Sequence, residues 1–178
     1  MNKAIFIDKD GTLVEYIPYE EKPKAEDILR NILMEDEVVE GLKYLQRKGF
    51  KLIIVSNQPW IAKGHVTTEE IENLFKELVL KLINKGVNIS DYFFCPHQTS
   101  DNCECKKPKP KMIFDAAKKH NVDLSKSFMI GDMDLDIKTG EKAGIKTFLV
   151  LTGRGESFKD IVYPTYILKN INEINKIL

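Results

Sequence analysis

Short apolar runs alternate along this chain with longer segments in which apolar and polar residues mix. Five of the runs have the length of a buried strand and are rich in β-branched or aromatic residues. They cover residues 4–7, 52–55, 92–94, 128–130 and 147–151, and a shorter run at 166–168 predicts an edge strand. Strands that are apolar almost throughout are typical of a parallel sheet covered on both faces.

The segments between the strands carry apolar residues at helical spacing. In residues 68–84, Ile71, Leu74, Leu78 and Leu82 fall on one face, and a Thr-Thr-Glu-Glu run marks the start. The same reasoning predicts helices over residues 38–48, 110–120, 135–143 and 171–178. Helices that alternate with strands predict an α/β fold with a doubly wound, mostly parallel sheet and helices on both of its faces.

Two segments, 15–34 and 96–111, show no periodicity, and irregular stretches of this length are usually functional loops or insertions. The first is too short for a separate domain, so we expect a loop that shapes specificity, with Tyr16 and Tyr19 as candidate contacts. The chain has 178 residues, of which 43% are hydrophobic and 30% charged. These values predict a single soluble domain over residues 1–178.

Charge and hydropathy exclude several classes of function. Lys and Arg number 27 and Asp and Glu also number 27, so the zero net charge argues against a nucleic-acid or membrane-surface binder. No apolar run approaches the roughly 18–20 residues of a membrane span. The first residues, MNKAIFID, lack the charged start and cleavage site of a signal peptide. We therefore expect a cytoplasmic protein that works without a membrane or a nucleic acid.

Polar motifs follow three of the predicted strands at their carboxyl ends. They are Asp8 and Asp10 after the first strand, Ser56, Asn57 and Gln58 after the second, and Asp132, Asp134 and Asp136 after the fourth. In an open parallel sheet these strand ends meet in one crevice, where ligands bind. Each motif alone is an ordinary turn or helix start, but their joint placement predicts one polar site.

The charges in this crevice predict a bound cation. Three acids close together repel one another unless a cation or a lysine lies among them. Asp8, Asp10 and Asp132 offer hard oxygen ligands of the kind that Mg²⁺ prefers, together with phosphate and water. Lys107, which comes from a proline-rich loop, is a candidate partner for the phosphate.

All three cysteines lie between residues 95 and 105. Clustered thiols in a reducing compartment bind metal more often than they form disulfides. Cys95, Cys103 and Cys105 make, with His97, a Cys₃His set that fits a tetrahedral zinc ion. Four protein ligands leave no open position, so this zinc would be structural and would staple the loop at about 95–111.

Four segments, taken in order, resemble the four motifs of the haloacid dehalogenase (HAD) superfamily of phosphohydrolases. They are Asp8-Lys9-Asp10-Gly11-Thr12, Ser56-Asn57, Lys107, and Gly131-Asp132 with Asp136. The resemblance extends from residue 8 to residue 136 and implies a Rossmann-like fold. No long insertion follows either of the first two motifs, which implies a member without a cap domain.

The resemblance also implies the chemistry. Asp8 would be the nucleophile that forms an aspartyl-phosphate, and Asp10 would be the general acid and then the general base. Mg²⁺ would be held by the Asp8 carboxylate, the backbone carbonyl of Asp10 and Asp132. Asp136 would orient Lys107 or the waters of the metal. The phosphate- and substrate-binding set would be Ser56, Asn57, Gln58, Lys106 and Lys107.

The zinc loop narrows the resemblance to two related branches. One removes the 7-phosphate of glycero-manno-heptose 1,7-bisphosphate, in carbohydrate metabolism, and the other hydrolyses histidinol phosphate. The Lys-Pro-Lys-Pro-x-Met-Ile run and the stand-alone length favour the heptose type, whereas the five-residue gap between His97 and Cys103 fits the histidinol type. Both branches typically carry Arg at the position of Lys106. Arg can bind a phosphate or a carboxylate through two parallel hydrogen bonds, whereas Lys offers only a point charge.

Other hypotheses stay open at this point. The substrate could be a different small phosphate ester, and a catalytically inactive phosphate- or metal-binding module could use the same scaffold. A third hypothesis is a protein-interaction domain with the zinc loop as its contact surface. We expect a phosphatase that acts on a small-molecule phosphate ester. We also expect a monomer, because the sequence shows no heptad or exposed apolar stripe.

Overall fold

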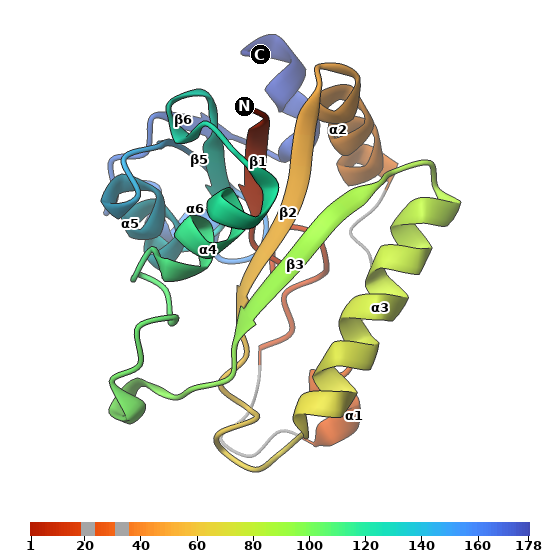
Figure 1. The fold of residues 1–178 in the computed structure, drawn as a ribbon, viewed down its shortest axis with the longest axis vertical. Helices are drawn as coiled ribbons and strands as arrows, with labels where there is room; N and C mark the ends of the chain where they lie inside the picture. The colour runs from red at the N-terminus through yellow and green to blue at the C-terminus, as the bar shows by residue number, and fades with distance from the viewer. Residues whose placement is uncertain (19–23, 31–35) are drawn as a thin grey trace.

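The computed structural model describes residues 1–18, 24–30 and 36–178. Its centre is a six-stranded sheet in the order β3-β2-β1-β4-β5-β6, and all neighbouring strands are parallel. The strands are β1 Lys3–Ile7, β2 Phe50–Asn57, β3 Ile89–Cys95, β4 Phe128–Gly131, β5 Lys146–Val150 and β6 Tyr166–Leu168. The predicted strands and the doubly wound, Rossmann-like α/β fold are confirmed (Figure 1).

Helices cover both faces of the sheet (Figure 1). On one face lie α2 (Asp36–Arg47) and α3 (Thr68–Asn84), and on the other lie α4 (Lys111–His120) and α5 (Asp134–Lys142). Strand side chains alternate between the two cores. In β1, Ile5 and Ile7 join the first core and Ala4 and Phe6 the second, so residues 4–7 are apolar throughout, as the sequence predicted.

The central position of β1 determines where the polar motifs meet. Ile7 pairs with Ile54 of β2 on one side and with Ile130 of β4 on the other. Because the three strands run in the same direction, their carboxyl ends reach the same edge of the sheet. The segments that begin with Asp8 and Asp132 therefore leave the sheet side by side.

The C-terminal segment differs from its prediction. Residues 171–178 were expected as an α-helix, but a 3-10 helix, η3 (Ile171–Lys176), occupies most of this range. Ile and Asn, which fill positions 171, 172, 174 and 175, are poor α-helix formers. The Asn170 side chain also accepts a hydrogen bond from the Asn172 amide, which favours a tight first turn. Ile171 and Ile174 are nevertheless buried, so the segment closes one face of the core as expected.

The irregular segment 15–34 contains a short helix, α1 (Ala25–Ile28), that the sequence did not predict. Another short helix, α6 (Gly155–Phe158), follows β5. Tyr19, a candidate contact, lies outside the described residues, whereas Tyr16 lies inside them. Across the described ranges, no helix has the length and the hydrophobicity that crossing a membrane requires.

Candidate active site

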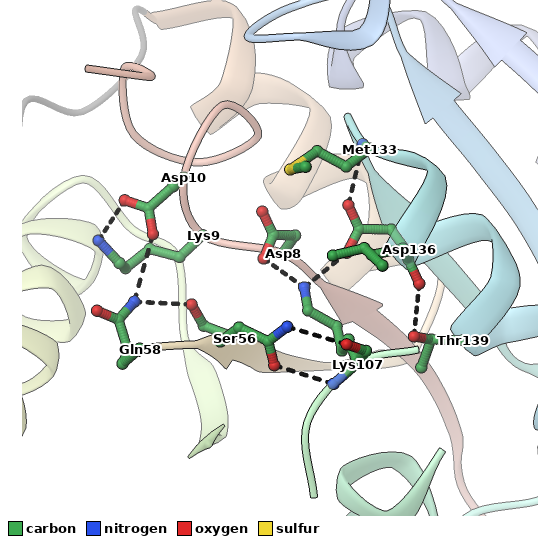
Figure 2. A network of polar contacts seen from close by, with 11 residues as sticks. Asp8, Lys9, Asp10, Ser56, Gln58, Lys107, Met133, Asp136 and Thr139 are labelled. Atoms are coloured by element: carbon green, nitrogen blue, oxygen red, sulfur yellow. Dashed lines mark hydrogen bonds and ion pairs between the residues drawn. The ribbon is translucent and has the colours of Figure 1, made fainter. Parts of the chain in front are cut away.

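Asp8, the first residue after β1, lies at the centre of the polar site and pairs with Lys107 (Figure 2). Lys107 Nζ is 2.6 Å from Asp8 Oδ1 and 2.6 Å from Asp136 Oδ1, and all three side chains are buried. Burial raises the pKa of Asp8, the charge of Lys107 lowers it, and the neighbouring acids raise it further. Burial alone would lower the pKa of Lys107, but Asp136 and Asp8 outweigh burial and raise it.

Asp132 is fully buried and only partly satisfied. Its Oδ2 accepts a hydrogen bond from the backbone N–H of Arg154 at 2.8 Å, but its Oδ1 has no partner among the described residues. Burial raises the pKa of Asp132 to about 7, although the Arg154 amide opposes this shift. Gly11 and Gly153, both at positive φ, crowd the same carboxylate, and a Cβ at either would lie 2.2 Å from Oδ2. A side chain at either glycine would therefore displace the Asp132 carboxylate.

The acids fit a divalent cation. One carboxylate oxygen from each of Asp8, Asp132 and Asp136 lies within 4.8 Å of the others. Oxygens that coordinate Mg²⁺ at roughly 2.1 Å lie at most about 4.2 Å apart, so the spacing is close to that of a magnesium site. The unpartnered Asp132 Oδ1 is the atom that such an ion would satisfy. Asp10 does not join this group through its side chain, which leaves its backbone carbonyl as the expected contribution.

The shifted pKa of Asp132 predicts how stability depends on pH. The folded protein holds this proton more tightly than the unfolded chain does. In the metal-free protein, the free energy of unfolding should therefore fall as the pH rises from 3.8 to about 7. The expected fall is roughly 2–4 kcal/mol. Saturating Mg²⁺ should remove most of it, because the cation stabilises the ionised carboxylate.

Urea denaturation across this pH range, with and without Mg²⁺, measures the effect. Asp132→Asn should flatten the slope in part, because burial also raises the pKa of Asp8. A metal-free protein that gains stability over this range would contradict the prediction.

Asp10 lies at the mouth of the site, with 31% of its side chain exposed. Its carboxylate is held from two sides (Figure 2). Lys9 Nζ lies 2.6 Å from Asp10 Oδ1, and Gln58 Nε2 donates to Asp10 Oδ2 at 3.3 Å. Gln58 Nε2 also donates to Ser56 Oγ at 2.9 Å, so one amide bridges the first two motifs.

Lys9 is the residue that sequence reasoning missed. Its side chain is 1% exposed, although lysine is among the residues that are most rarely buried. Its position between the two aspartates was the only available signal. Arg154, which follows β5, contacts Asp132 through its backbone amide and not through its side chain.

The side-chain amides of Asn57 and Gln58, at the end of β2, have different partners. Asn57 uses both polar atoms of its side chain on the backbone of Lys107, at 2.9 and 3.2 Å. A cleft of about 100 Å³ opens beside these groups. It is lined by Asp8, Asp10, Tyr16, Asn57, Lys107, Met133, Leu135 and Asp136.

The four predicted zinc ligands lie together at the end of β3. Cys95 Sγ is 3.0 Å from Cys105 Sγ and 3.5 Å from Cys103 Sγ, and Cys103 and Cys105 are 3.6 Å apart. His97 Nδ1 lies 3.3 Å from Cys105 Sγ and 3.6 Å from Cys95 Sγ. Sulfur ligands around tetrahedral zinc lie about 3.8 Å apart, so the set is close to coordination geometry. All three cysteines are free of disulfides.

A second hollow, of about 300 Å³, lies between the zinc loop and α5. It adjoins the cleft, because Lys107 and Leu135 line both. Its other charged lining residues are Lys106, Lys109 and Lys142. Lys106 Nζ donates to the carbonyl of His97 at 3.1 Å. Trp60 packs against the core, and Lys63 Nζ lies 4.0 Å from its ring centre.

The chain is similar to several known proteins. Residues 104–174 match the family model of HAD-hydrolase-like proteins. D-glycero-beta-D-manno-heptose-1,7-bisphosphate 7-phosphatase of Pasteurella multocida is 33% identical over an alignment of 186 positions, which covers 100% of this chain and 97% of that protein. A histidine biosynthesis bifunctional protein HisB of Campylobacter jejuni is 33% identical over 147 residues, which are 81% of this chain but 40% of that protein.

A solved structure has the same fold. The D,D-heptose 1,7-bisphosphate phosphatase of B. bronchiseptica, complexed with magnesium and phosphate, superposes with a TM-score of 0.85 at 24% identity, over 98% of this chain and 96% of that one. Fold and matches together define a phosphatase of the HAD superfamily. Within it, the chain belongs to the family of the D-glycero-manno-heptose-1,7-bisphosphate 7-phosphatases.

Proposed function

We propose that this chain hydrolyses D-glycero-D-manno-heptose 1,7-bisphosphate at its 7-phosphate, with Asp8 as nucleophile. The observation that carries the choice of substrate is the lysine-lined hollow beside the reaction cleft. Lys106, Lys107, Lys109 and Lys142 line it, and no carboxylate does. A bisphosphate whose 7-phosphate lies at Asp8 has a second phosphate to place, and a cationic wall attracts that group.

Lys142 is the best placed of these lysines to take an anion. Lys106 already bonds to the carbonyl of His97, and Lys109 bonds to the carbonyl of Cys103 and pairs with Glu104 Oε1 at 2.9 Å. Among the described residues, no hydrogen bond or ion pair engages Lys142 Nζ. Its ammonium is therefore available to the distal end of a substrate. This supports a substrate with two anionic groups over one that carries a cationic amine.

The first half of the reaction would transfer the phosphoryl group to Asp8. One Asp8 oxygen attacks phosphorus, and the bond from phosphorus to the sugar oxygen breaks. Asp10, exposed at the cleft mouth, gives its proton to that leaving oxygen. Lys107 and Ser56 hold the other phosphoryl oxygens, and Asp136 keeps Lys107 in place through the 2.6 Å ion pair.

The second half would return the enzyme to its starting state. Asp10, now a carboxylate, takes a proton from water, and the resulting oxygen attacks phosphorus. The bond from phosphorus to the Asp8 oxygen breaks, which releases inorganic phosphate and the free carboxylate. Gln58 and Lys9 hold the Asp10 carboxylate between the two steps through their contacts at 3.3 and 2.6 Å.

Two metals fit the residues present. Mg²⁺ held by Asp8, Asp132 and the carbonyl of Asp10 would neutralise the charge that repels a phosphate from carboxylates. Zinc held by Cys95, His97, Cys103 and Cys105 would keep the loop folded. We place the reaction in the cytoplasm, because three adjacent thiols stay available for metal only in a reducing compartment. We propose that one domain, residues 1–178, suffices for the activity and acts as a monomer.

Histidinol phosphate is the second candidate substrate. The similarity to a bifunctional histidine-biosynthesis protein and the five-residue gap between His97 and Cys103 favour it. Its amine is a cation at neutral pH, and the hollow would repel it. The same hollow would accept the second phosphate of the heptose.

The deciding experiment compares phosphate release from the two substrates at matched low concentration with Mg²⁺. We expect kcat/KM for the heptose bisphosphate, in its better anomer, to exceed that for histidinol phosphate by roughly 10²-fold or more, because an attraction between charges is replaced by a repulsion. Lys142→Gln should reduce this ratio through KM, with Lys138→Gln, an exposed lysine on the same helix, as the matched control. A higher value for histidinol phosphate would overturn the choice of substrate but keep the phosphatase chemistry.

A further inference from the structure

Asn57 connects the second motif to the third. Its side-chain Oδ1 accepts a hydrogen bond from the backbone N–H of Lys107 at 2.9 Å, and its Nδ2 donates to the backbone carbonyl of Lys107 at 3.2 Å. One amide side chain thus takes both backbone groups of a single residue that lies 50 positions away in the sequence. This pairing copies the two hydrogen bonds that a neighbouring strand would make.

Lys107 needs such support because its own segment has no regular structure. It lies between the zinc ligand Cys105 and the start of α4 at Lys111, in neither a helix nor a strand. Across the described residues, no hydrogen bond other than those from Asn57 reaches the backbone N–H or carbonyl of Lys107. Its ammonium must nevertheless reach two buried carboxylate oxygens, each at 2.6 Å. A shift of the Lys107 backbone would therefore move its ammonium relative to both carboxylates.

Asn57 is itself held firmly. It is the last residue of β2 and pairs with Cys95 of β3 in the parallel register. The next residue, Gln58, donates its backbone N–H to the carbonyl of Cys95 at 2.7 Å. The end of β2 therefore fixes the start of the zinc loop at Cys95 and, through Asn57, a later point of the same loop at Lys107.

We propose that Asn57 is a positioning residue for Lys107, acting on the phosphoryl group through that lysine and not by contacting phosphate itself. The effect on rate rests on the proposed function. The effect on the backbone of Lys107 does not, since it follows from the two hydrogen bonds alone. The two parts can therefore fail separately.

A double-mutant cycle tests the effect on rate. Lys107→Met alone should lower kcat by roughly 10²-fold or more, and Asn57→Ala alone by roughly 10- to 10²-fold. The double variant should be no slower than Lys107→Met, because the residue that Asn57 positions is already absent. If Asn57 bound the phosphate directly, the two losses would multiply, and that outcome would overturn the proposal.

Amide hydrogen exchange tests the contact without any substrate. In Asn57→Ala, the N–H of Lys107 should exchange at least roughly tenfold faster, because its acceptor is absent. The N–H of Lys109, which donates to the carbonyl of Lys106 at 2.9 Å, should keep its rate. Unchanged protection at Lys107 would overturn the proposal even if phosphatase activity were abolished.

Two further variants keep the test decisive. Asn57→Asp retains the size and the acceptor, so the N–H of Lys107 should stay protected even if the alanine variant is unstable. Asn88→Ala makes the same change at an exposed amide just before β3, remote from the site, and should leave both exchange and turnover unchanged. Loss of protection at Lys107 in Asn57→Asp would overturn the assignment of Oδ1 as its acceptor.

Discussion

Asp8→Asn should lower phosphate release by roughly 10³-fold or more while the protein stays folded, because an amide oxygen cannot form the aspartyl-phosphate. The substitution should not destabilise the metal-free protein. Asp8 is one of three buried acids around a single lysine, and its own pKa is raised mainly by burial and further by Asp136 and Asp132. Removing its charge therefore relieves repulsion, so we expect an unchanged or higher melting temperature.

The measurement combines phosphate release with thermal unfolding of the same preparations. Asp115→Asn is the matched control, because Asp115 lies on α4 in an exposed i,i+4 pair with Lys111. It should match the unsubstituted protein in rate. An Asp8→Asn variant that keeps more than about a tenth of the original turnover would exclude Asp8 as the nucleophile.

Loss of the zinc ligands should have the second-largest effect. Cys103→Ser, or chelation under reducing conditions, should lower the free energy of unfolding by roughly 3 kcal/mol or more, because a loop that loses its metal cross-link regains much of its conformational freedom. Turnover should fall as well, although Asp8, Asp10 and Asp132 are untouched, since the loop that zinc closes leads directly into Lys107. Metal analysis should find one zinc per chain before the change and none after it.

Chelators also remove Mg²⁺, so the treated protein is assayed after Mg²⁺ alone, and then zinc, is added back. Only zinc should restore both the melting temperature and the rate. Ser100→Ala, an exposed position in the same loop, controls for a local substitution. A zinc-free protein that keeps its stability and its rate would show that the Cys₃His set has no structural role.

The sequence was sufficient for the sheet and for the convergence of the motifs. Strands that are buried on both faces are mostly apolar, so they can be recognised in the sequence as short apolar runs. A parallel sheet then brings the carboxyl ends of all its strands to one edge. That topology brings Asp8 and Asp136 to the same edge, where Lys107 Nζ lies 2.6 Å from a carboxylate oxygen of each. The closeness of the zinc candidates follows from their spacing within one loop.

Other features depend on side-chain direction, which no periodic pattern encodes. Lysine is usually exposed, so only its position between two aspartates marked Lys9 as a possible buried partner of Asp10. Asn57 was predicted to bind substrate or phosphate, and in the structure both polar atoms of its side chain bond to the backbone of Lys107, 50 positions away. Spacing predicted a regular helix for residues 171–178, and local propensity favoured the tighter turns of η3. The catalytic roles and the single-domain organisation stay predictions.

The place of β1 in the sheet also bears on how the protein is made. This first strand has apolar side chains on both faces, and Ile5 pairs with Phe128 of β4 as well as with Leu52 of β2. During synthesis, the edge of β1 that pairs with β4 therefore stays unpaired until β4 has left the ribosome. Pairing over such sequence distances is slow and exposes the intermediate to aggregation. A chain released before residue 128 would lack Asp132 and half of its central sheet, so a truncated product should be recognised by chaperones as unfolded rather than accumulate as a weak enzyme.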